Sequence, residues 1–167
     1  IKSGKEENFD FQILNATENV NKAQKVILVS EIEKYFGGNI KDKKIAMWGL
    51  AFKANTDDIR EASSLDNISL LLEKGAKITA YDAIAEENVK KIFGDKIEYT
   101  KDMYSCLEDA DCLLIATEWS EFKNPNFQLM AEKMKNKAIF DGRNMFSIDQ
   151  IENTGFYYKS IGRKTIK

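Results

Sequence analysis

The sequence predicts an α/β protein in which a mostly parallel sheet carries helices on both faces and follows a long N-terminal helix. After Gly38, short strand patterns alternate with helical patterns, which is typical of parallel sheets connected through helices. The apolar stretches are short and nearly continuous, as expected for strands that helices bury on both faces. This arrangement is Rossmann-like, and 167 residues suffice for one such domain with an ordinary core.

The N-terminal helix is predicted from about Phe11 to Phe36, and the pair Gly37-Gly38 ends it. It is indicated by apolar residues that step by three and four positions: Val20, Ala23, Ile27, Leu28, Ile32 and Tyr35. The residues before it, 1–10, are polar. We therefore divide the chain into a helical region, 1–38, and an α/β domain, 39–167. The helix could pack on that domain or on a partner.

The remaining elements alternate regularly along the chain. Strands are predicted at about Lys44–Gly49, Lys77–Tyr81, Ile97–Tyr99, Cys112–Thr117, Ala138–Asp141 and Tyr157–Ile161. Helices are predicted at about Ser64–Lys74, Ala85–Ile92, Met103–Glu108, Phe127–Met134 and Ser147–Glu152. Gly75 is a suitable C-terminal cap for the first of these helices, and Asn126 and Ser147 are suitable N-caps.

The composition disfavours several classes of protein. The formal net charge is −2, whereas a nucleic-acid-binding domain usually carries a basic face. No apolar run approaches the ~20 residues that cross a bilayer, and no signal peptide is visible, so we expect a cytoplasmic protein with no membrane partner. The absence of His disfavours a hydrolytic triad or a zinc site. Cys106 and Cys112 make no disulfide framework and are expected in the core.

A long loop follows the first predicted strand. Connections between a strand and the next helix usually take about 2 to 6 residues, whereas Leu50 to Ala62 gives thirteen. Such a loop lies where open α/β sheets hold ligands, and its Lys53 and Arg60 favour an anion. The loop matches neither a P-loop nor G-x-G-x-x-G. Asp57 and Asp58 could cap the next helix or bind Arg60, and a solvated loop with internal ion pairs is the alternative.

Two further strand ends carry polar residues beside aromatic ones. Asp82 could hold ribose hydroxyls, as an acid does at this place in dinucleotide folds, or could cap the following helix. Thr117 and Glu118 would lie at the same edge of the sheet. The neighbouring Trp119 and Phe122 could wall a pocket, although pinning the loop to the core is the better-supported role.

The fifth strand ends in Asp141-Gly142-Arg143-Asn144. Gly142 permits a tight turn, after which Arg143 projects at the same edge as Lys53. Three strands thus deliver polar groups to one rim of the sheet. This convergence predicts a binding site there without identifying the anion.

Several blocks of residues together resemble the UDP-glucose/GDP-mannose dehydrogenase family. They are Gly49-Leu50-Ala51-Phe52-Lys53, Thr56-Asp57-Asp58-Ile59-Arg60-Glu61, Ala80-Tyr81-Asp82, Thr117-Glu118-Trp119, Phe140-Asp141-Gly142-Arg143-Asn144 and Ser160-Ile161-Gly162-Arg163. The resemblance covers nearly the whole chain, is specific in combination, and is greatest to the bacterial members that oxidise UDP-glucose. Ala54 stands where the family often has proline, which concerns the stiffness of the loop more than its chemistry.

The resemblance implies the following organisation. The family oxidises the C6 hydroxyl of a UDP-sugar to a carboxylate with two NAD⁺, through an enzyme-bound thiohemiacetal and thioester. It has an N-terminal NAD-binding domain, a central helix used in dimerisation and a C-terminal domain that binds the UDP part. Residues 1–38 then correspond to the end of the central helix region, and residues 39–167 to the UDP-sugar-binding C-terminal α/β domain.

The resemblance also implies roles for individual residues. Phe52 and Lys53 match the substrate-binding Phe-Lys pair of the family, and Arg143 matches an arginine that contacts the UDP-sugar. Arg60 matches the arginine that reaches the NAD cofactor bound to the other domain. The expected partners are therefore a UDP-sugar, the N-terminal domain that this chain lacks, and a second copy in a homodimer.

The catalytic residues of the family have no counterpart here. Neither Cys106 nor Cys112 lies in the Gly-Gly-x-Cys context of the family nucleophile, and the chain starts at Ile1 rather than Met, as expected where a longer chain has been cut. We therefore expect this polypeptide alone to be inactive in hydride transfer.

Two alternatives stay open at this point. One is the same domain of a UDP-N-acetylhexosamine dehydrogenase. The other is a non-catalytic nucleotide-binding or regulatory α/β module, such as a receiver-like domain. A receiver needs a pair of acids after its first strand, where this chain has Gly49-Leu50-Ala51.

Overall fold

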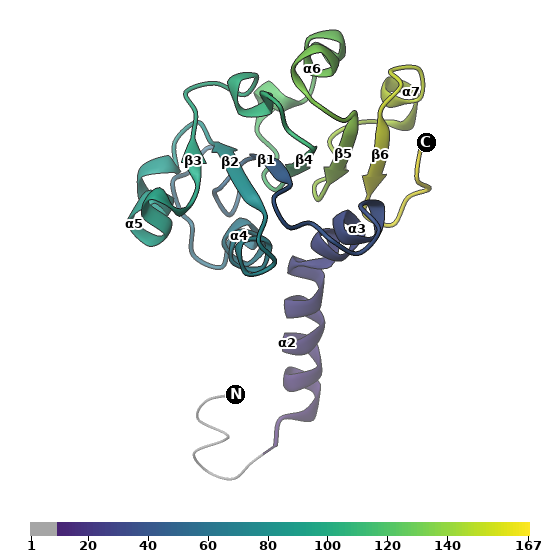
Figure 1. Ribbon diagram of the computed structural model, residues 1–167. Coiled ribbons are helices and arrows are strands. Elements are labelled where there is room, and N and C mark those ends of the chain that lie inside the picture. The colour runs from purple at the N-terminus through teal and green to yellow at the C-terminus, as the bar shows by residue number, and fades with distance from the viewer. Residues whose placement is uncertain (1–9) are drawn as a thin grey trace.

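A six-stranded, wholly parallel sheet forms the centre of the molecule in the computed structural model, which describes residues 10–167 (Figure 1). The strands are β1 (Lys44–Trp48), β2 (Lys77–Tyr81), β3 (Glu98–Tyr99), β4 (Cys112–Ile115), β5 (Ala138–Asp141) and β6 (Tyr157–Ser160). The α-helices are α2 (Gln12–Lys25), α3 (Ile27–Tyr35), α4 (Ser63–Glu73), α5 (Glu86–Phe93), α6 (Phe127–Lys133) and α7 (Ile148–Ile151). The short 3₁₀ helices are η1 (Gly94–Lys96), η2 (Ser105–Leu107) and η3 (Ser120–Phe122). The predicted fold class is confirmed.

The strand order β3-β2-β1-β4-β5-β6 places β1 beside β4, where the direction of strand addition reverses. Trp48, the last residue of β1, pairs with Tyr81 of β2 and with Ile115 of β4. Open α/β sheets bind ligands at such a reversal, outside the carboxyl ends of the strands. A receiver-type sheet has the order 2-1-3-4-5, so the receiver-like alternative is wrong.

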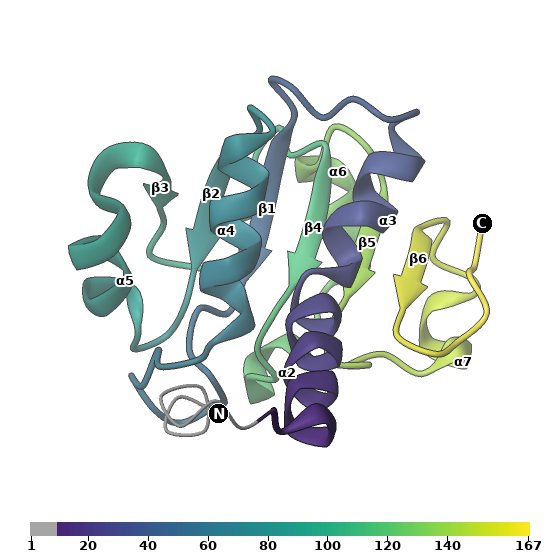
Figure 2. The same cartoon turned by 90° about the horizontal axis from the view of Figure 1, so that it is seen from below.

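Helices cover both faces of the sheet. Helices α3, α4 and α5 pack on one face through buried residues that include Ile32, Ile68 and Val89 (Figure 2). The helices η2, η3, α6 and α7 cover the other face. On that face, Trp48 stacks on Phe122 and donates its indole N–H to the Met103 carbonyl at 2.8 Å. Burial on both faces explains why the strand segments read as continuous apolar runs.

The predicted N-terminal helix is present but is interrupted. Helix α2 ends at Lys25 and α3 begins at Ile27, because Val26 has φ −112° and ψ 9°, outside helical values. Helix α2 buries no residue and extends away from the sheet, whereas α3 packs against it (Figure 1). The predicted helical range is confirmed, and the interruption at Val26 is a feature that the sequence pattern did not indicate. The division between 1–38 and 39–167 stays a prediction, and residues 1–9 lie outside the described part.

The other predicted elements agree closely with the structure, with one exception. The segment 103–108 forms only the 3₁₀ turn η2 instead of the predicted α-helix. The Asp102 carboxylate accepts the N–H groups of Tyr104 and Ser105, and Asp109 at φ 55° redirects the chain soon afterwards. The N-caps predicted at Asn126 and Ser147 are confirmed, and Ser147 forms a capping box with Gln150.

Among residues 10–167, no helix combines the length and the apolarity that crossing a membrane requires.

Candidate functional site

The loop 49–62, between β1 and α4, approaches the loop that follows β4. Gly49 lies at φ +88°, and a Cβ built on it would be 2.4 Å from the Cβ of Thr117. Only glycine fits this position, since a side chain would collide with the neighbouring loop. The two loops thus meet at the point where the strand order reverses.

Backbone hydrogen bonds fix the first residues of this loop. The N–H groups of Leu50 and Ala51 donate to Asp82 Oδ2 at 2.6 and 3.1 Å. The Ala51 carbonyl accepts from Thr117 Oγ1 at 2.6 Å, and the Leu50 carbonyl accepts from the Ser64 hydroxyl. Because Asp82, Thr117 and Ser64 are all buried, these bonds form in a protected environment.

Arg143 joins three loops at the same edge of the sheet. Its Nε donates to the Ala116 carbonyl at 2.8 Å, and its Nη2 donates to the Phe52 carbonyl at 3.0 Å. Glu118 Oε2 lies 3.2 Å from Nε but has no hydrogen-bond partner among the described residues, since that N–H points to Ala116. We call Phe52, Lys53, Glu118 and Arg143 the lip. The predicted convergence of loops after β1, β4 and β5 is confirmed.

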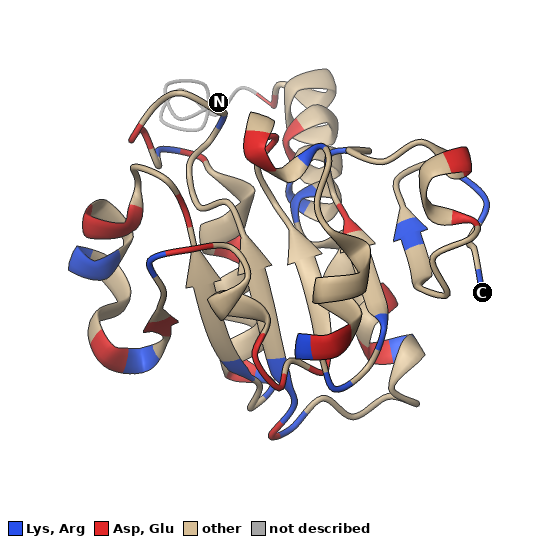
Figure 3. Ribbon diagram, turned by 90° about the horizontal axis from the view of Figure 1, so that it is seen from above, with Lys and Arg blue, Asp and Glu red and all other residues tan. Residues whose placement is uncertain are grey.

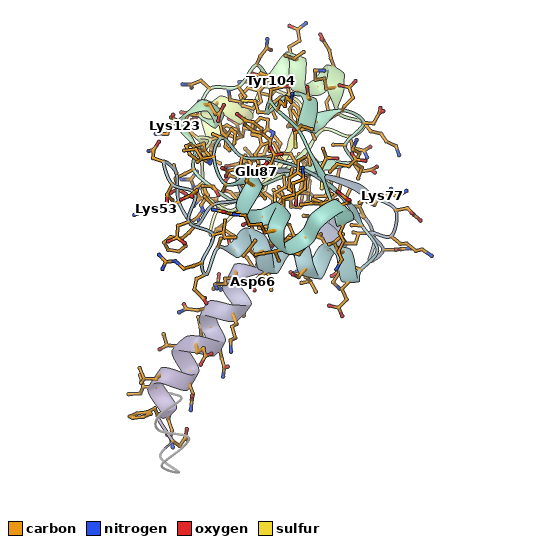
Figure 4. All side chains as sticks on the ribbon, turned by 90° about the vertical axis from the view of Figure 1, so that its left-hand side faces the viewer. Lys53, Asp66, Lys77, Glu87, Tyr104 and Lys123 are labelled. Carbon is orange, nitrogen blue, oxygen red and sulfur yellow. The ribbon has the colours of Figure 1, made fainter. Side chains whose placement is uncertain are left out.

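The exposed members of the lip are Phe52 and Lys53. The Phe52 ring is 48% exposed. Lys53 is exposed and forms no hydrogen bond or ion pair with any residue of the described chain. Figure 4 shows Lys53 and Lys77 on opposite sides of the domain, which agrees with their positions after β1 and at the start of β2.

Hydrogen bonds to Asp141 fix the turn that carries Arg143. This buried carboxylate accepts the N–H groups of Arg143 and Met145 at 2.8 and 2.6 Å, and the Tyr158 hydroxyl at 2.7 Å. Burial, and then the charge of Asp141, raise the pKa of Tyr158, so it stays a neutral donor. The base of Arg143 is therefore fixed before any ligand binds.

Arg60 is connected to the lip through Asp58, whose carbonyl accepts the Phe52 N–H at 2.8 Å. Its Nε and Nη2 donate to the two oxygens of Asp58 at 2.9 and 2.7 Å, and its side chain is 87% exposed. Hydrogen bonding by Arg60 lowers the pKa of Asp58 to about 2. The pair borders a shallow depression with Thr56 and Asn88 rather than the lip. Of the two roles open to Asp58, binding Arg60 is confirmed.

A groove of about 990 Å³ runs from the lip to helix α2. Phe52, Ala116, Gly142 and Arg143 line one end, and Leu14 of α2 lies at the other. Figure 3 shows charged residues at the ends of the strands and on the helices, while the strands are mostly uncharged. No group of side chains in residues 10–167 is suited to hold a metal ion.

The side chains of Asp82, Trp119 and Phe122 are all buried. The predicted roles of Asp82 in binding ribose and of the two aromatic residues in lining a pocket are therefore not observed. Both oxygens of Asp82 are occupied by protein N–H groups, so it has none left for a ribose. Trp119 and Phe122 are buried in the core, as the structural alternative predicted. Sequence reasoning located Asp82 but missed its contact with the loop 49–62, because nothing in a linear pattern links residues about thirty positions apart.

The comparison with protein families decides the relationship. Residues 46–148 match the model of the UDP-glucose/GDP-mannose dehydrogenase family, UDP binding domain. The chain belongs to the UDP-glucose/GDP-mannose dehydrogenase family. The matched segment includes every residue of the lip and Arg60.

Individual relatives agree with this assignment. UDP-glucose 6-dehydrogenase TuaD of Bacillus subtilis is 36% identical over 100% of this chain, which spans 36% of that protein. The solved UDP-glucose dehydrogenase of Pyrobaculum islandicum superposes with a TM-score of 0.76 at 29% identity, covering 87% of this chain and 32% of that one. The UDP-N-acetyl-mannosamine dehydrogenase Cap5O of Staphylococcus aureus superposes at 0.68 and 25% identity, covering 93% and 34%. The chain thus spans about a third of the length of these relatives.

Proposed function

We propose that this chain is the UDP-sugar-binding part of an NAD-dependent UDP-glucose 6-dehydrogenase, with its lip as the binding site for the diphosphate. The observation that carries the proposal is Arg143, whose guanidinium is braced by two backbone carbonyls where three loops converge. An arginine presents five N–H donors in a rigid fork. Two are used by the protein, so the others are free to bind phosphate oxygens.

The other members of the lip complement Arg143 in this proposal. Lys53 adds a second, exposed positive charge, which acts at a distance on Asp58. The half-exposed Phe52 ring offers an apolar surface to the sugar or the base. Glu118 Oε2, 3.2 Å from Arg143 Nε, partly balances the charge of the arginine.

Hydride transfer requires groups beyond these residues. Cys106 and Cys112 are fully buried, and burial raises the pKa of Cys106 to about 12 and that of Cys112 further. Neither thiol is therefore a candidate for a reactive thiolate. We assign NAD binding mainly to an N-terminal domain outside this chain, with Arg60 reaching toward the cofactor, and we expect no NADH from UDP-glucose with these 167 residues alone.

Homodimer formation through α2 is part of the same proposal. This helix buries no residue, and Ile13 and Val20 on it are 82% and 59% exposed. Apolar side chains exposed on a projecting helix are a typical contact surface. A cytoplasmic location also stays a prediction.

The test is a calorimetric titration of the chain with UDP. Losing one charge-assisted contact costs about 1.5–3 kcal/mol, so Lys53→Ala and Arg143→Ala should each weaken binding about tenfold or more. The matched control is Lys77→Ala, a surface lysine at the opposite end of the sheet, which should bind as the wild type does. Equal affinity of wild type, Lys53→Ala and Arg143→Ala would show that the lip is assigned wrongly.

A UDP-N-acetylhexosamine is the second candidate substrate, favoured by the similarity to the Staphylococcus aureus enzyme. The 167 residues carry only the UDP-binding part in this proposal. The two substrates are therefore distinguished by assaying NADH formation by the longer protein with each UDP-sugar.

A further inference from the structure

Asp82 has an unusual orientation for a carboxylate at the end of the second strand. In dinucleotide-binding folds an acid at this place reaches out to the ribose. Here the side chain is buried, at 4% exposed, and turned inward. Its Oδ2 accepts from Leu50 N at 2.6 Å, Ala51 N at 3.1 Å and Trp119 Nε1 at 3.0 Å.

The second oxygen is occupied as well. Oδ1 accepts from Ile84 N at 2.9 Å and from Ala85 N at 2.8 Å. Five N–H donors therefore surround one carboxylate, and no Lys or Arg of the described chain forms an ion pair with it. An uncharged side chain cannot replace it, because an amide has one acceptor oxygen and an NH₂ that would face N–H donors.

This carboxylate determines where the lip lies. Leu50 and Ala51 directly precede Phe52 and Lys53, and Asp82 holds their N–H side. Hydroxyl groups hold the carbonyl side of the same two residues. Arg143 in turn binds the Phe52 carbonyl, so the position of that carbonyl sets the distance between Arg143 and Lys53.

We propose that Asp82 is a positioning residue that fixes Phe52-Lys53 relative to Arg143 for binding of the nucleoside diphosphate, and that it takes no part in binding ribose. The inference rests on the proposed function of the lip. It assigns to Asp82 an effect on ligand affinity that acts through the backbone of Leu50 and Ala51. Fixing these residues in advance avoids the cost of ordering them on binding.

The experiment is a double-mutant cycle on the 167-residue chain, titrated with UDP. Asp82→Asn should weaken binding about tenfold. In the Asp82→Asn background, Lys53→Ala should have less than about a threefold further effect, because Lys53 is no longer held opposite Arg143. The matched control is Asp111→Asn, an equally buried carboxylate that binds the N–H of Lys44 at the start of β1. It should leave UDP affinity unchanged at an equal folded fraction.

A milder pair of variants covers the case in which Asp82→Asn does not fold. Trp119→Phe removes one donor to Asp82 and should weaken UDP binding roughly two- to tenfold. Trp48→Phe is the control, since it removes a buried indole N–H bonded to the Met103 carbonyl instead. Two results would overturn the positioning role alone. One is that Lys53→Ala weakens UDP binding by the same factor in the wild type and in Asp82→Asn. The other is that Trp119→Phe binds UDP as tightly as the wild type. Absence of UDP binding by the wild-type chain would instead overturn it together with the proposed function.

Discussion

Arg143 and Lys53 carry the same charge but are held very differently. Arg143 donates two hydrogen bonds to backbone carbonyls, while Lys53 is exposed and donates none to the described chain. In the proposed site, Arg143 presents N–H donors in a fixed orientation, whereas Lys53 contributes a positive charge on a flexible side chain. Replacing one by the other is therefore not conservative.

The first prediction concerns Arg143→Lys. Lysine keeps the charge but cannot reach both carbonyls with a planar fork, so UDP affinity should fall about tenfold in a calorimetric titration. Arg163→Lys is the matched control, because Arg163 also donates to a backbone carbonyl, that of Phe146, without belonging to the lip. Full affinity in Arg143→Lys would mean that charge alone matters here.

Asp58 provides a prediction on pH. Its folded pKa of about 2 lies below the usual 3.8, so ionised Asp58 stabilises the fold above about pH 4, and this contribution is lost as the pH falls through 2. Carboxyl chemical shifts followed by NMR should titrate near 2 in the wild type and at a clearly higher pH in Arg60→Gln, which loses the guanidinium but keeps the bond from the backbone N–H of residue 60 to Asp58. An unchanged titration in that variant would rule out Arg60 as the cause. The pair is exposed, so its effect on the free energy of unfolding should be small.

At the scale of elements, the junction between α2 and α3 shows what sequence periodicity misses. The apolar spacing continues through Val26, and so it predicted one helix. At the break, Asn67 Nδ2 donates to the Lys25 carbonyl at 2.9 Å and to the Ser63 carbonyl at 2.6 Å, so a residue of α4 binds the last residue of α2. Lys25 also pairs with Glu61 at 2.6 Å. A contact between residues so far apart in sequence leaves no periodic pattern.

The junction leads to a stability prediction. Asn67→Ala removes both hydrogen bonds of a buried amide, and also its Oδ1, which has no partner among the described residues. The net loss in free energy of unfolding should be about 1 to 2 kcal/mol, measured by urea denaturation. Ser69→Ala, at an exposed position of the same helix, should change it by less than about 0.5 kcal/mol. An equal effect of the two variants would show that Asn67 does not stabilise the junction.

The strands were predicted better than the loops for a physical reason. Lys77–Tyr81 and Ala138–Asp141 match the structure at both ends, because apolar runs bounded by polar residues mark strands buried on two faces. In contrast, η2 is a short 3₁₀ turn because of hydrogen bonds made by a single Asp102 side chain. Such local competition is weakly encoded in hydrophobic pattern.

For the whole molecule, strand order decides where function lies. The direction of strand addition reverses between β1 and β4, and this brings together the loops that follow these two strands, about sixty-five residues apart in sequence. Gly49 allows the two loops to come into contact, because it has no side chain. The sequence predicted that Lys53 and Arg143 share a rim, since the carboxyl ends of parallel strands meet at one edge. It did not predict that all hydrogen-bonding positions of Asp82 are used within the protein, because this depends on how the loop 49–62 folds.

The central claim is that the lip binds the diphosphate of a UDP-sugar. It is tested most directly by a crystal structure of this chain with UDP bound. We predict phosphate oxygens within hydrogen-bonding distance of the Arg143 guanidinium and the Lys53 ammonium. Density for UDP in the depression beside Arg60, or at the α2 end of the groove with Arg143 and Lys53 free, would contradict the account.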